Sequence, residues 1–204
     1  MAAQKSIVIM AKFQVRKILG KWRVGYALDL QTLSSTPIGY NEFGHMQFDT
    51  KRSEVGELLY RLKYRGDKSV VQELVEAVAA AVGQPSEKIE AIVPVPFSTP
   101  RDVQPVTILA EAIGQRLGIP VADCVKRTRE LTQLKDVYDL DERLKLLEGA
   151  HTVDKAAVNG KKVLLFDDLY RSGATMNAIT TLLYDEGGAR DVVALTITRT
   201  RSNQ

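Results

Sequence analysis

Two adjacent acids, Asp167 and Asp168, come directly after an unbroken apolar run in the last quarter of the sequence. The run, residues 163–166, is typical of a strand that is buried on both faces, as in a parallel sheet. A short polar turn with one glycine, Gly173, follows the acids, and a helical pattern begins at Thr175. Open α/β sheets build ligand sites in this order, where a strand ends and the next helix begins.

The turn has the composition of an anion site. Backbone N–H groups of residues 172–174 would lack helical partners, and the positive end of the helix dipole lies beside them. Gly173 lets the backbone approach an oxygen closely, and Ser172 and Thr175 add hydroxyl donors. Each charge-assisted hydrogen bond to a phosphate contributes about 1.5–3 kcal/mol. We therefore expect a phosphate to bind at this turn.

The acids precede the turn and would repel that phosphate. Carboxylates are acceptors, so they suit vicinal hydroxyls or a hydrated Mg²⁺. A phosphate, two hydroxyls and a metal at this spacing indicate a ribose 5-phosphate. The same residues also fit a buried strand whose acids cap the next helix, or a Walker B strand. The chain has no G-x-x-x-x-G-K-[ST] motif, which argues against the last interpretation.

Strands and helices alternate along the rest of the chain, which predicts an α/β fold with a mostly parallel central sheet flanked by helices. Gly66 suits the end of a first helix that begins near Val55, and residues 69–72 suit a capping box for the second. The expected strands are 89–93, 121–125, 161–168 and 192–198, and the other expected helices are 71–82, 102–117 and 175–186.

The amino-terminal part differs in pattern. Residues 6–16 and 22–30 alternate in hydropathy and predict a β-hairpin, whereas residues 31–52 are expected to form a loop with at most one short strand around residues 39–43. We therefore divide the chain into a β-rich appendage or hood, 1–65, and a core, 66–204. Every charge before Asp29 is positive, which fits either a solvated outer face or a basic surface for nucleic acid or an acidic partner.

Composition sets further bounds. A chain of 204 residues suits one domain, or one domain with an appendage. The excess of Lys plus Arg over Asp plus Glu, 28 to 25, is too small to imply nucleic acid by itself. A single cysteine, Cys124, excludes an internal disulfide framework and a cysteine-based zinc site, and predicts a cytoplasmic protein. No apolar run is long enough for a transmembrane helix, so no membrane partner is expected.

Residues 163–175 resemble the PRPP-binding motif of type I phosphoribosyltransferases, where PRPP is 5-phosphoribosyl 1-pyrophosphate. That motif has four apolar residues, two acids, an apolar and a variable residue, two Thr or Ser, Gly, a variable residue and Thr. The one departure here is Arg171, which stands where the family usually has Thr. An arginine can still contact phosphate in a bidentate manner, so we interpret it as a variant of the motif.

Other segments are similar to the ComF (competence-related) branch of that family. They are L-K-Y-R-G at residues 62–66, V-P-V-P at 93–96, and an arginine-rich stretch that continues from Arg127 to Gln133 and Arg143. The likeness spans roughly residues 55–200. Two departures matter: this chain has no cysteine-rich zinc ribbon, and it lacks the R-G-F-N-Q segment that follows V-P-V-P in the branch. Arg101 is the nearest cation to that position, which puts the usual pyrophosphate contacts in doubt.

The resemblance implies a site and a reaction. PRPP would bind with Mg²⁺, pyrophosphate would leave C1 of the ribose, and an acceptor would attack an oxocarbenium-like centre without a protein nucleophile. Mg²⁺ would bind through PRPP and water, with the two acids as the candidates for direct contact. The implied catalytic residues are Asp167 and Asp168. The implied PRPP contacts are these two acids together with Tyr170, Arg171, Ser172, Gly173, Ala174 and Thr175.

The resemblance also implies that residues 97–101 face pyrophosphate and that residues 126–150 form a lid that excludes water. The pyrophosphate and lid candidates are Ser98, Arg101, Arg127, Arg129 and Lys135. For Arg127, Arg129 and Lys135 the alternative is an ordinary solvated cation. His45 and His151 are isolated in the sequence and are interpreted as structural or surface residues.

Three hypotheses for function follow. The first is an active transferase that moves phosphoribose onto a nucleobase or an amine. The second is a non-catalytic PRPP-pocket module of the ComF type that acts in DNA uptake or processing through partners. The third, an ordinary purine or orotate salvage enzyme, is disfavoured because the Lys63-Tyr64 segment has no counterpart there that we recognise. The acceptor and the oligomeric state stay open, with a homodimer among the states considered.

Overall fold

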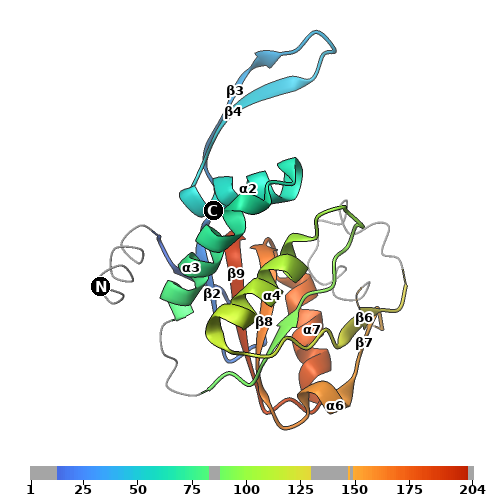
Figure 1. Cartoon of the computed structure of the whole chain (residues 1–204). Coiled ribbons are helices and arrows are strands. Elements are labelled where there is room, and N and C mark those ends of the chain that lie inside the picture. Colours follow the sequence, from blue (N-terminus) through green and yellow to red (C-terminus); the bar gives the residue numbers. More distant parts are fainter. Residues whose placement is uncertain (1–12, 83–87, 130–146, 148, 202–204) are drawn as a thin grey trace, which may run out of the picture.

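A five-stranded sheet forms the centre of the protein (Figure 1). The computed structural model describes residues 13–82, 88–129, 147 and 149–201. The strands, in spatial order, are β1 (Arg16–Lys17), β2 (Val24–Leu30), β9 (Asp191–Arg199), β8 (Lys162–Tyr170) and β5 (Ala91–Pro94). The last four are parallel to one another, and β1 is antiparallel to β2. The predicted fold class, an α/β protein with a mostly parallel sheet, is therefore confirmed.

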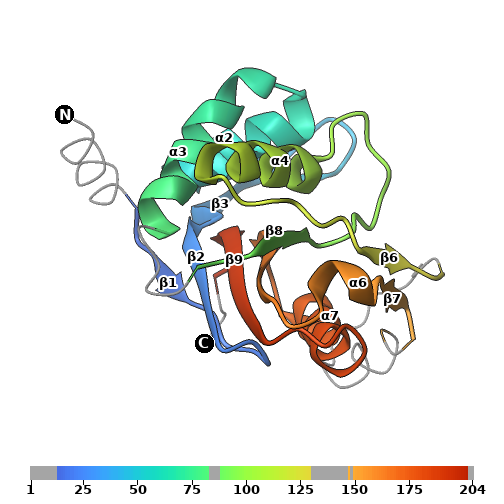
Figure 2. The ribbon, with the colours of Figure 1, turned by 60° about the horizontal axis from the view of Figure 1, so that its bottom comes forward.

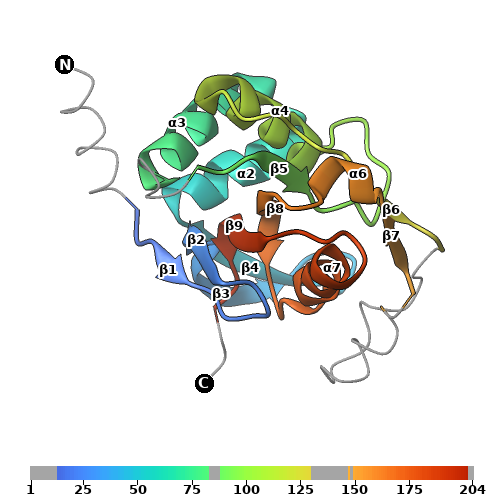
Figure 3. The same ribbon diagram turned by 90° about the horizontal axis from the view of Figure 1, so that it is seen from below.

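Helices cover both faces of this sheet (Figures 2 and 3). One face carries α2 (Glu54–Arg65), α3 (Val71–Val82) and α4 (Pro105–Leu117), and the other carries α6 (Lys155–Val158) and α7 (Ala174–Asp185). A short 3₁₀ helix, η1 (Lys68–Val70), joins α2 to α3. Among the described residues, no helix has both the length and the apolar character that crossing a bilayer requires.

The strand β8 is buried on both faces, as its apolar run predicts. Leu164 and Phe166 pack into a cluster with α2, α3 and α4, whereas Val163 and Leu165 pack into a second cluster with α7. All four side chains are at most 2% exposed. Burial of one such side chain stabilises the fold by about 1.5–3 kcal/mol, so this strand holds the two layers together.

The residues at the helix ends explain where most of the helices begin and stop. Gly66 ends α2 with φ 65°, in the left-handed conformation that glycine adopts easily, as predicted. In contrast, the predicted capping box at residues 69–72 is wrong, because the carboxylate of Asp67 caps η1 by accepting from the Ser69 N–H. The helix α4 begins at Pro105 and not at residue 102, since proline is suited to the first turn of a helix.

Strand ends depend on pairing. The strand β8 continues to Tyr170, two residues beyond the prediction, because Asp167 pairs with Thr196 and Tyr170 with Arg199 of β9. The expected strand 121–125 is reduced to a single bridge between Val121 and Ile92. A separate antiparallel pair follows, formed by β6 (Val125–Arg127) and β7 (His151–Val153).

The described part of the predicted amino-terminal hairpin is present, with Arg16 of β1 opposite Ala27 of β2. Residues 6–12 of that prediction lie outside the described residues. The strand β2 also pairs along its length with β9 of the central sheet. The division of the chain at residue 65 stays a prediction.

The loop expected at residues 31–52 is wrong. Strands β3 (Thr32–Tyr40) and β4 (Met46–Arg52) form an antiparallel hairpin that projects from the body of the protein (Figure 1). Its turn is fixed by Asn41, whose side-chain oxygen accepts from the N–H groups of Phe43 and His45. The polar run and Pro37 looked like a loop, but cross-strand pairing with two register shifts accommodates them.

Large apolar side chains on this hairpin are exposed, among them Tyr40, Phe43 and Phe48. We predict that replacing all three by serine changes the free energy of unfolding by no more than about 0.5 kcal/mol per site, since surface substitutions rarely do more. Leu59→Ala, in the core, should instead lose about 2–5 kcal/mol. Denaturant unfolding of both variants measures the difference. A large loss in the serine variant would mean that the hairpin packs against the body.

Candidate functional site

A pocket of about 890 Å³ lies where β8 ends and α7 begins. Four separate segments line it: the loop after β5, the end of β6 with its continuation, Leu147 with the start of β7, and the end of β8 with the turn into α7. Its lining residues are Pro96, Phe97, Ser98, Thr99, Pro100, Arg127, Thr128, Arg129, Leu147, His151, Asp167, Leu169, Tyr170, Arg171, Ser172, Gly173, Ala174, Thr175 and Met176. The structure thus brings the predicted phosphate turn, one predicted acid and part of the predicted pyrophosphate side into one cavity.

The turn into α7 is shaped around Gly173. Its φ is 76°, and it directly precedes the first residue of α7, whose N–H donates to Oγ of Ser172 at 3.4 Å. A Cβ atom at this position would lie 2.6 Å from Cε2 of Tyr170. The Tyr170 ring is held in turn by an edge contact with Trp22 and by its hydroxyl, which donates to the carbonyl of Leu19 at 3.0 Å. The first N–H groups of α7 therefore border the pocket beside a residue that must be small.

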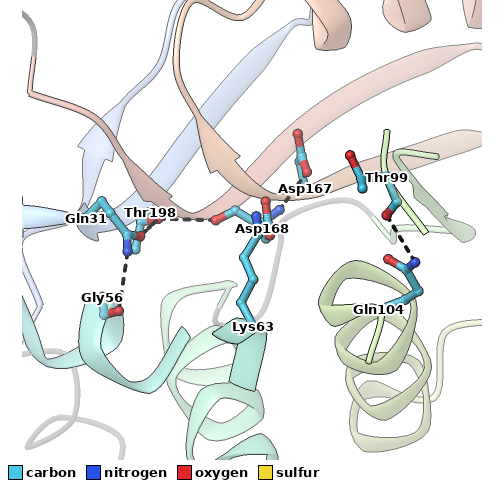
Figure 4. A network of polar contacts seen from close by, with 8 residues as sticks. All are labelled: Gln31, Gly56, Lys63, Thr99, Gln104, Asp167, Asp168 and Thr198. Atoms are coloured by element: carbon cyan, nitrogen blue, oxygen red, sulfur yellow. Dashed lines mark hydrogen bonds and ion pairs between the residues drawn. The ribbon is translucent and has the colours of Figure 1, made fainter. Parts of the chain in front are cut away.

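The two acids do not face the same way. Asp167 lines the pocket, whereas Asp168 is absent from its lining and is only 7% exposed. The Asp168 carboxylate lies 2.5 Å from Nζ of Lys63 on α2 (Figure 4). Successive side chains of a strand point to opposite faces of the sheet, so the sequence D-D sends one carboxylate toward α7 and the other toward α2.

Asp167 has an unusual protonation equilibrium. Burial, and then the neighbouring charge of Asp168, raise the pKa of the Asp167 carboxyl to about 8. The Asp168 N–H, which donates to Oδ1 of Asp167 at 2.8 Å, and the charge of Lys63 act in the opposite direction. At neutral pH the empty pocket therefore holds Asp167 mostly as the neutral acid.

The predicted cations differ in position. Arg127 borders the pocket, and its guanidinium donates to the carbonyl of Ser98 at 2.9 Å, which ties β6 to the loop after β5. Arg129 and Arg171 also line the pocket. Arg101 does not, because its guanidinium lies 5.5 Å from the centre of the Tyr64 ring instead. Lys135 lies outside the described residues.

His151 is a pocket residue that the sequence did not reveal. It is 8% exposed, and it lies opposite Arg127 in the β6–β7 pair. Burial, and then the nearby charge of Arg127, lower its pKa, so the ring is neutral at neutral pH. The sequence carries no local signal for a pocket position of His151, because that position depends on the pairing of β6 with β7, which lie on either side of positions 130–146. His45, in contrast, is exposed on the hairpin turn, as expected.

The donor set of the pocket fits a metal only in part. Among the described residues, no group of three or more His, Cys, Asp or Glu side chains could hold a metal ion. Asp167 is the one carboxylate among the described lining residues. Mg²⁺ in proteins often takes one or two carboxylates and completes its shell with water and phosphate oxygens. The pocket therefore fits Mg²⁺ that arrives with a phosphorylated ligand.

Comparison with solved structures defines the class of fold. Adenine phosphoribosyltransferase from Trypanosoma brucei, in complex with AMP, pyrophosphate and ribose-5-phosphate, superposes with a TM-score of 0.51 at 14% identity, over 92% of this chain and 75% of that one. Orotate phosphoribosyltransferase from Aeropyrum pernix gives a TM-score of 0.46 at 16% identity, over 83% and 76%. The first match shows that this chain has the type I phosphoribosyltransferase fold.

Comparison of sequences identifies a curated protein that is similar to this chain. The chain is 27% identical over 144 residues to the competence protein ComFC of Bacillus subtilis (strain 168). The match covers 70% of this chain and 59% of the relative, so the chain spans less than two thirds of the relative's length. No protein-family model matches the chain. The predicted resemblance to ComF-type proteins with this fold is confirmed.

The turn at Gly173 gives a first test of the site. Because a side chain in the left-handed region costs about 1–2 kcal/mol, Gly173→Ala should destabilise the protein by that amount and by a further cost of displacing Tyr170. Gly118→Ala is the matched control, since its φ is 67° and a Cβ there would meet nothing within 4 Å. Denaturant unfolding compares the two. Equal losses would show that Tyr170 does not hold the turn.

Asp167 gives a test in pH. The folded protein keeps a proton on this carboxyl up to about pH 8, whereas the unfolded chain releases it near 3.8. Proton linkage then makes the contribution of Asp167 to the unfolding free energy fall as pH rises between these values and stay flat above them. We therefore predict that the unfolding free energy of Asp167→Asn, minus that of the unmodified protein, rises between pH 5 and pH 8. Denaturant unfolding of both proteins measures this difference. The exposed carboxylate of Asp123 supplies the control, Asp123→Asn, which should show no such trend.

Proposed function

We propose that this chain is a phosphoribosyltransferase-like protein that binds PRPP with Mg²⁺ and transfers phosphoribose to a nucleobase or an amine, with release of pyrophosphate. One observation carries the proposal: a single pocket is lined by the start of helix α7, by the half-buried carboxylate of Asp167, and by Arg127 and Arg129 at the end of β6 and just beyond it. These are the groups that a 5-phosphate, a ribose and a pyrophosphate each need.

The phosphate end uses the turn before α7. Residues 171–175 offer backbone N–H groups, the Ser172 and Thr175 hydroxyls and the Arg171 guanidinium. A phosphate there gains from the positive end of a twelve-residue helix as well as from these donors. The tight packing of Gly173 against Tyr170 supports this role because it leaves no room for a side chain at position 173.

The ribose lies next to Asp167. A carboxyl group at this position accepts hydrogen bonds from vicinal hydroxyls most strongly when it is ionised. Asp167 would then release its proton to solvent as the ligand binds. Mg²⁺, when bound, would supply positive charge that favours the ionised carboxylate and balances the charge of pyrophosphate. Asp168 would act indirectly: its carboxylate pairs with Lys63, and its backbone N–H donates to the Asp167 carboxyl.

The pyrophosphate would lie toward Ser98, Arg127 and Arg129. Arg127 is already bonded to the carbonyl of Ser98, so it also fixes the loop that faces the leaving group. His151 adds a neutral ring to the same wall. Arg101 lies outside the pocket lining, which leaves fewer cations on the leaving-group side than the family resemblance implied.

The second candidate function is a PRPP-binding module without transferase activity that acts with DNA or DNA-processing partners. The placement of Arg101 over Tyr64 and the similarity to a competence protein favour it. Pyrophosphate release, measured across a panel of nucleobases and amines, separates the two candidates. Tight PRPP binding without any release would favour the module. DNA affinity that falls as salt rises would add support for phosphate contacts.

Binding of PRPP tests both candidates at once. We predict that calorimetry with PRPP and Mg²⁺ detects a one-to-one complex, and that Asp167→Asn weakens it by about tenfold or more, because a charge-assisted hydrogen bond contributes about 1.5–3 kcal/mol. Asp123→Asn, whose side chain does not line the pocket, should bind like the unmodified protein. No binding by the unmodified protein would refute the proposal, and unchanged affinity in Asp167→Asn would remove the role assigned to that carboxyl.

A further inference from the structure

The contact between Lys63 and Asp168 joins two parts of the chain that are 105 residues apart. Nζ lies 2.5 Å from Oδ2, and the two side chains are only 20% and 10% exposed. Removing one partner of a partly buried charge pair leaves the other charge poorly compensated and destabilises the protein. The pair is therefore a fixed feature of the protein and not a solvated surface contact.

The helix that carries Lys63 is itself held firmly. Ser53 caps α2 by accepting from the Gly56 N–H, and its hydroxyl donates to the carbonyl of Leu30 on β2. Leu59 and Leu62 are at most 2% exposed in the core beneath the helix. The helix α2 is thus anchored to the sheet at its start and packed into the core near its end, where it presents the Lys63 ammonium to the end of β8 (Figure 4).

Asp168 links Lys63 to the pocket residue Asp167. Its backbone N–H donates to Oδ1 of Asp167 at 2.8 Å, so the position of residue 168 sets the orientation of the neighbouring carboxyl. A second restraint comes from β9, which pairs with β8 at Asp167 and at Leu169, on either side of residue 168. Residue 168 is therefore held from both its side chain and its backbone.

We propose that Lys63 is a positioning residue for the pocket: its ion pair with Asp168 fixes the end of β8, so that the Asp167 carboxyl is aimed at the hydroxyls of a bound sugar phosphate. This inference rests on the proposed function, and it divides the two acids by task. Asp167 contacts the ligand, and Asp168 contacts Lys63.

A second ion pair on the same helix gives a matched control. Arg61 of α2 pairs with Asp67 at 2.6 Å, but these side chains are 37% and 28% exposed, and neither lines the pocket. Arg61→Met therefore removes a cation from the same helix without touching the acidic pair. Lys63→Arg keeps a cation at position 63 and tests rescue.

The first measurement is PRPP affinity with Mg²⁺ by calorimetry, alongside thermal unfolding of each variant. Lys63→Met should weaken binding by about tenfold or more, since breaking a buried charge pair has effects of this size or larger. Lys63→Arg should recover most of the affinity, and Arg61→Met should bind like the unmodified protein. Adding Asp168→Asn to Lys63→Met should cause little further loss, because residues that act as one unit are not additive. Equal affinity in a folded Lys63→Met variant would overturn the proposal.

The second measurement does not need PRPP. The amide proton of Asp168 reports the hydrogen bond to Asp167, and its chemical shift can be followed by NMR in the ligand-free protein. We expect this signal to move in Lys63→Met, to return in Lys63→Arg and to stay in place in Arg61→Met. If the unmodified protein fails to bind PRPP, the proposed function is wrong but this test still applies. An unmoved Asp168 signal in Lys63→Met would overturn the positioning role whatever the ligand.

Discussion

The burial of β8 on both faces is the constraint on which the rest of the structure depends. A strand that is covered by helices on either side must send alternate side chains into two different cores. When the apolar run ends, the same alternation continues through Asp167 and Asp168. One carboxyl therefore emerges beside α7, where the pocket is, and the other beneath α2, where Lys63 meets it.

This division has an electrostatic consequence. Two adjacent carboxylates at the end of a buried strand repel each other and are poorly solvated, which is costly unless one is paired or protonated. Lys63 pairs with Asp168, and Asp167 keeps its proton to about pH 8. The carboxyl that lines the pocket is thus mostly neutral at neutral pH, whereas the carboxylate that faces α2 is paired with a lysine.

The pocket itself is assembled from segments that are distant in the chain. Arg127 and His151 face each other across the β6–β7 pair, and Arg127 is tied to the loop after β5. Trp22, from the amino-terminal part, holds Tyr170 against the turn at Gly173. The connection between β1 and β2 therefore contributes to the site through packing, although the projecting hairpin β3–β4 points away from the body (Figure 1).

The sequence by itself determined the fold class, the position of β8 and the strand–turn–helix order around Gly173, because these follow from local periodicity and from the conformations that glycine and proline allow. It could not assign a task to each acid, place Lys63 or His151, or recognise the β3–β4 hairpin. Those features depend on pairing and packing between residues far apart in the chain, and a run of identical charges such as D-D carries no record of which face each side chain will meet. Only the tertiary structure decided that one carboxyl belongs to the pocket and the other to a lysine on α2.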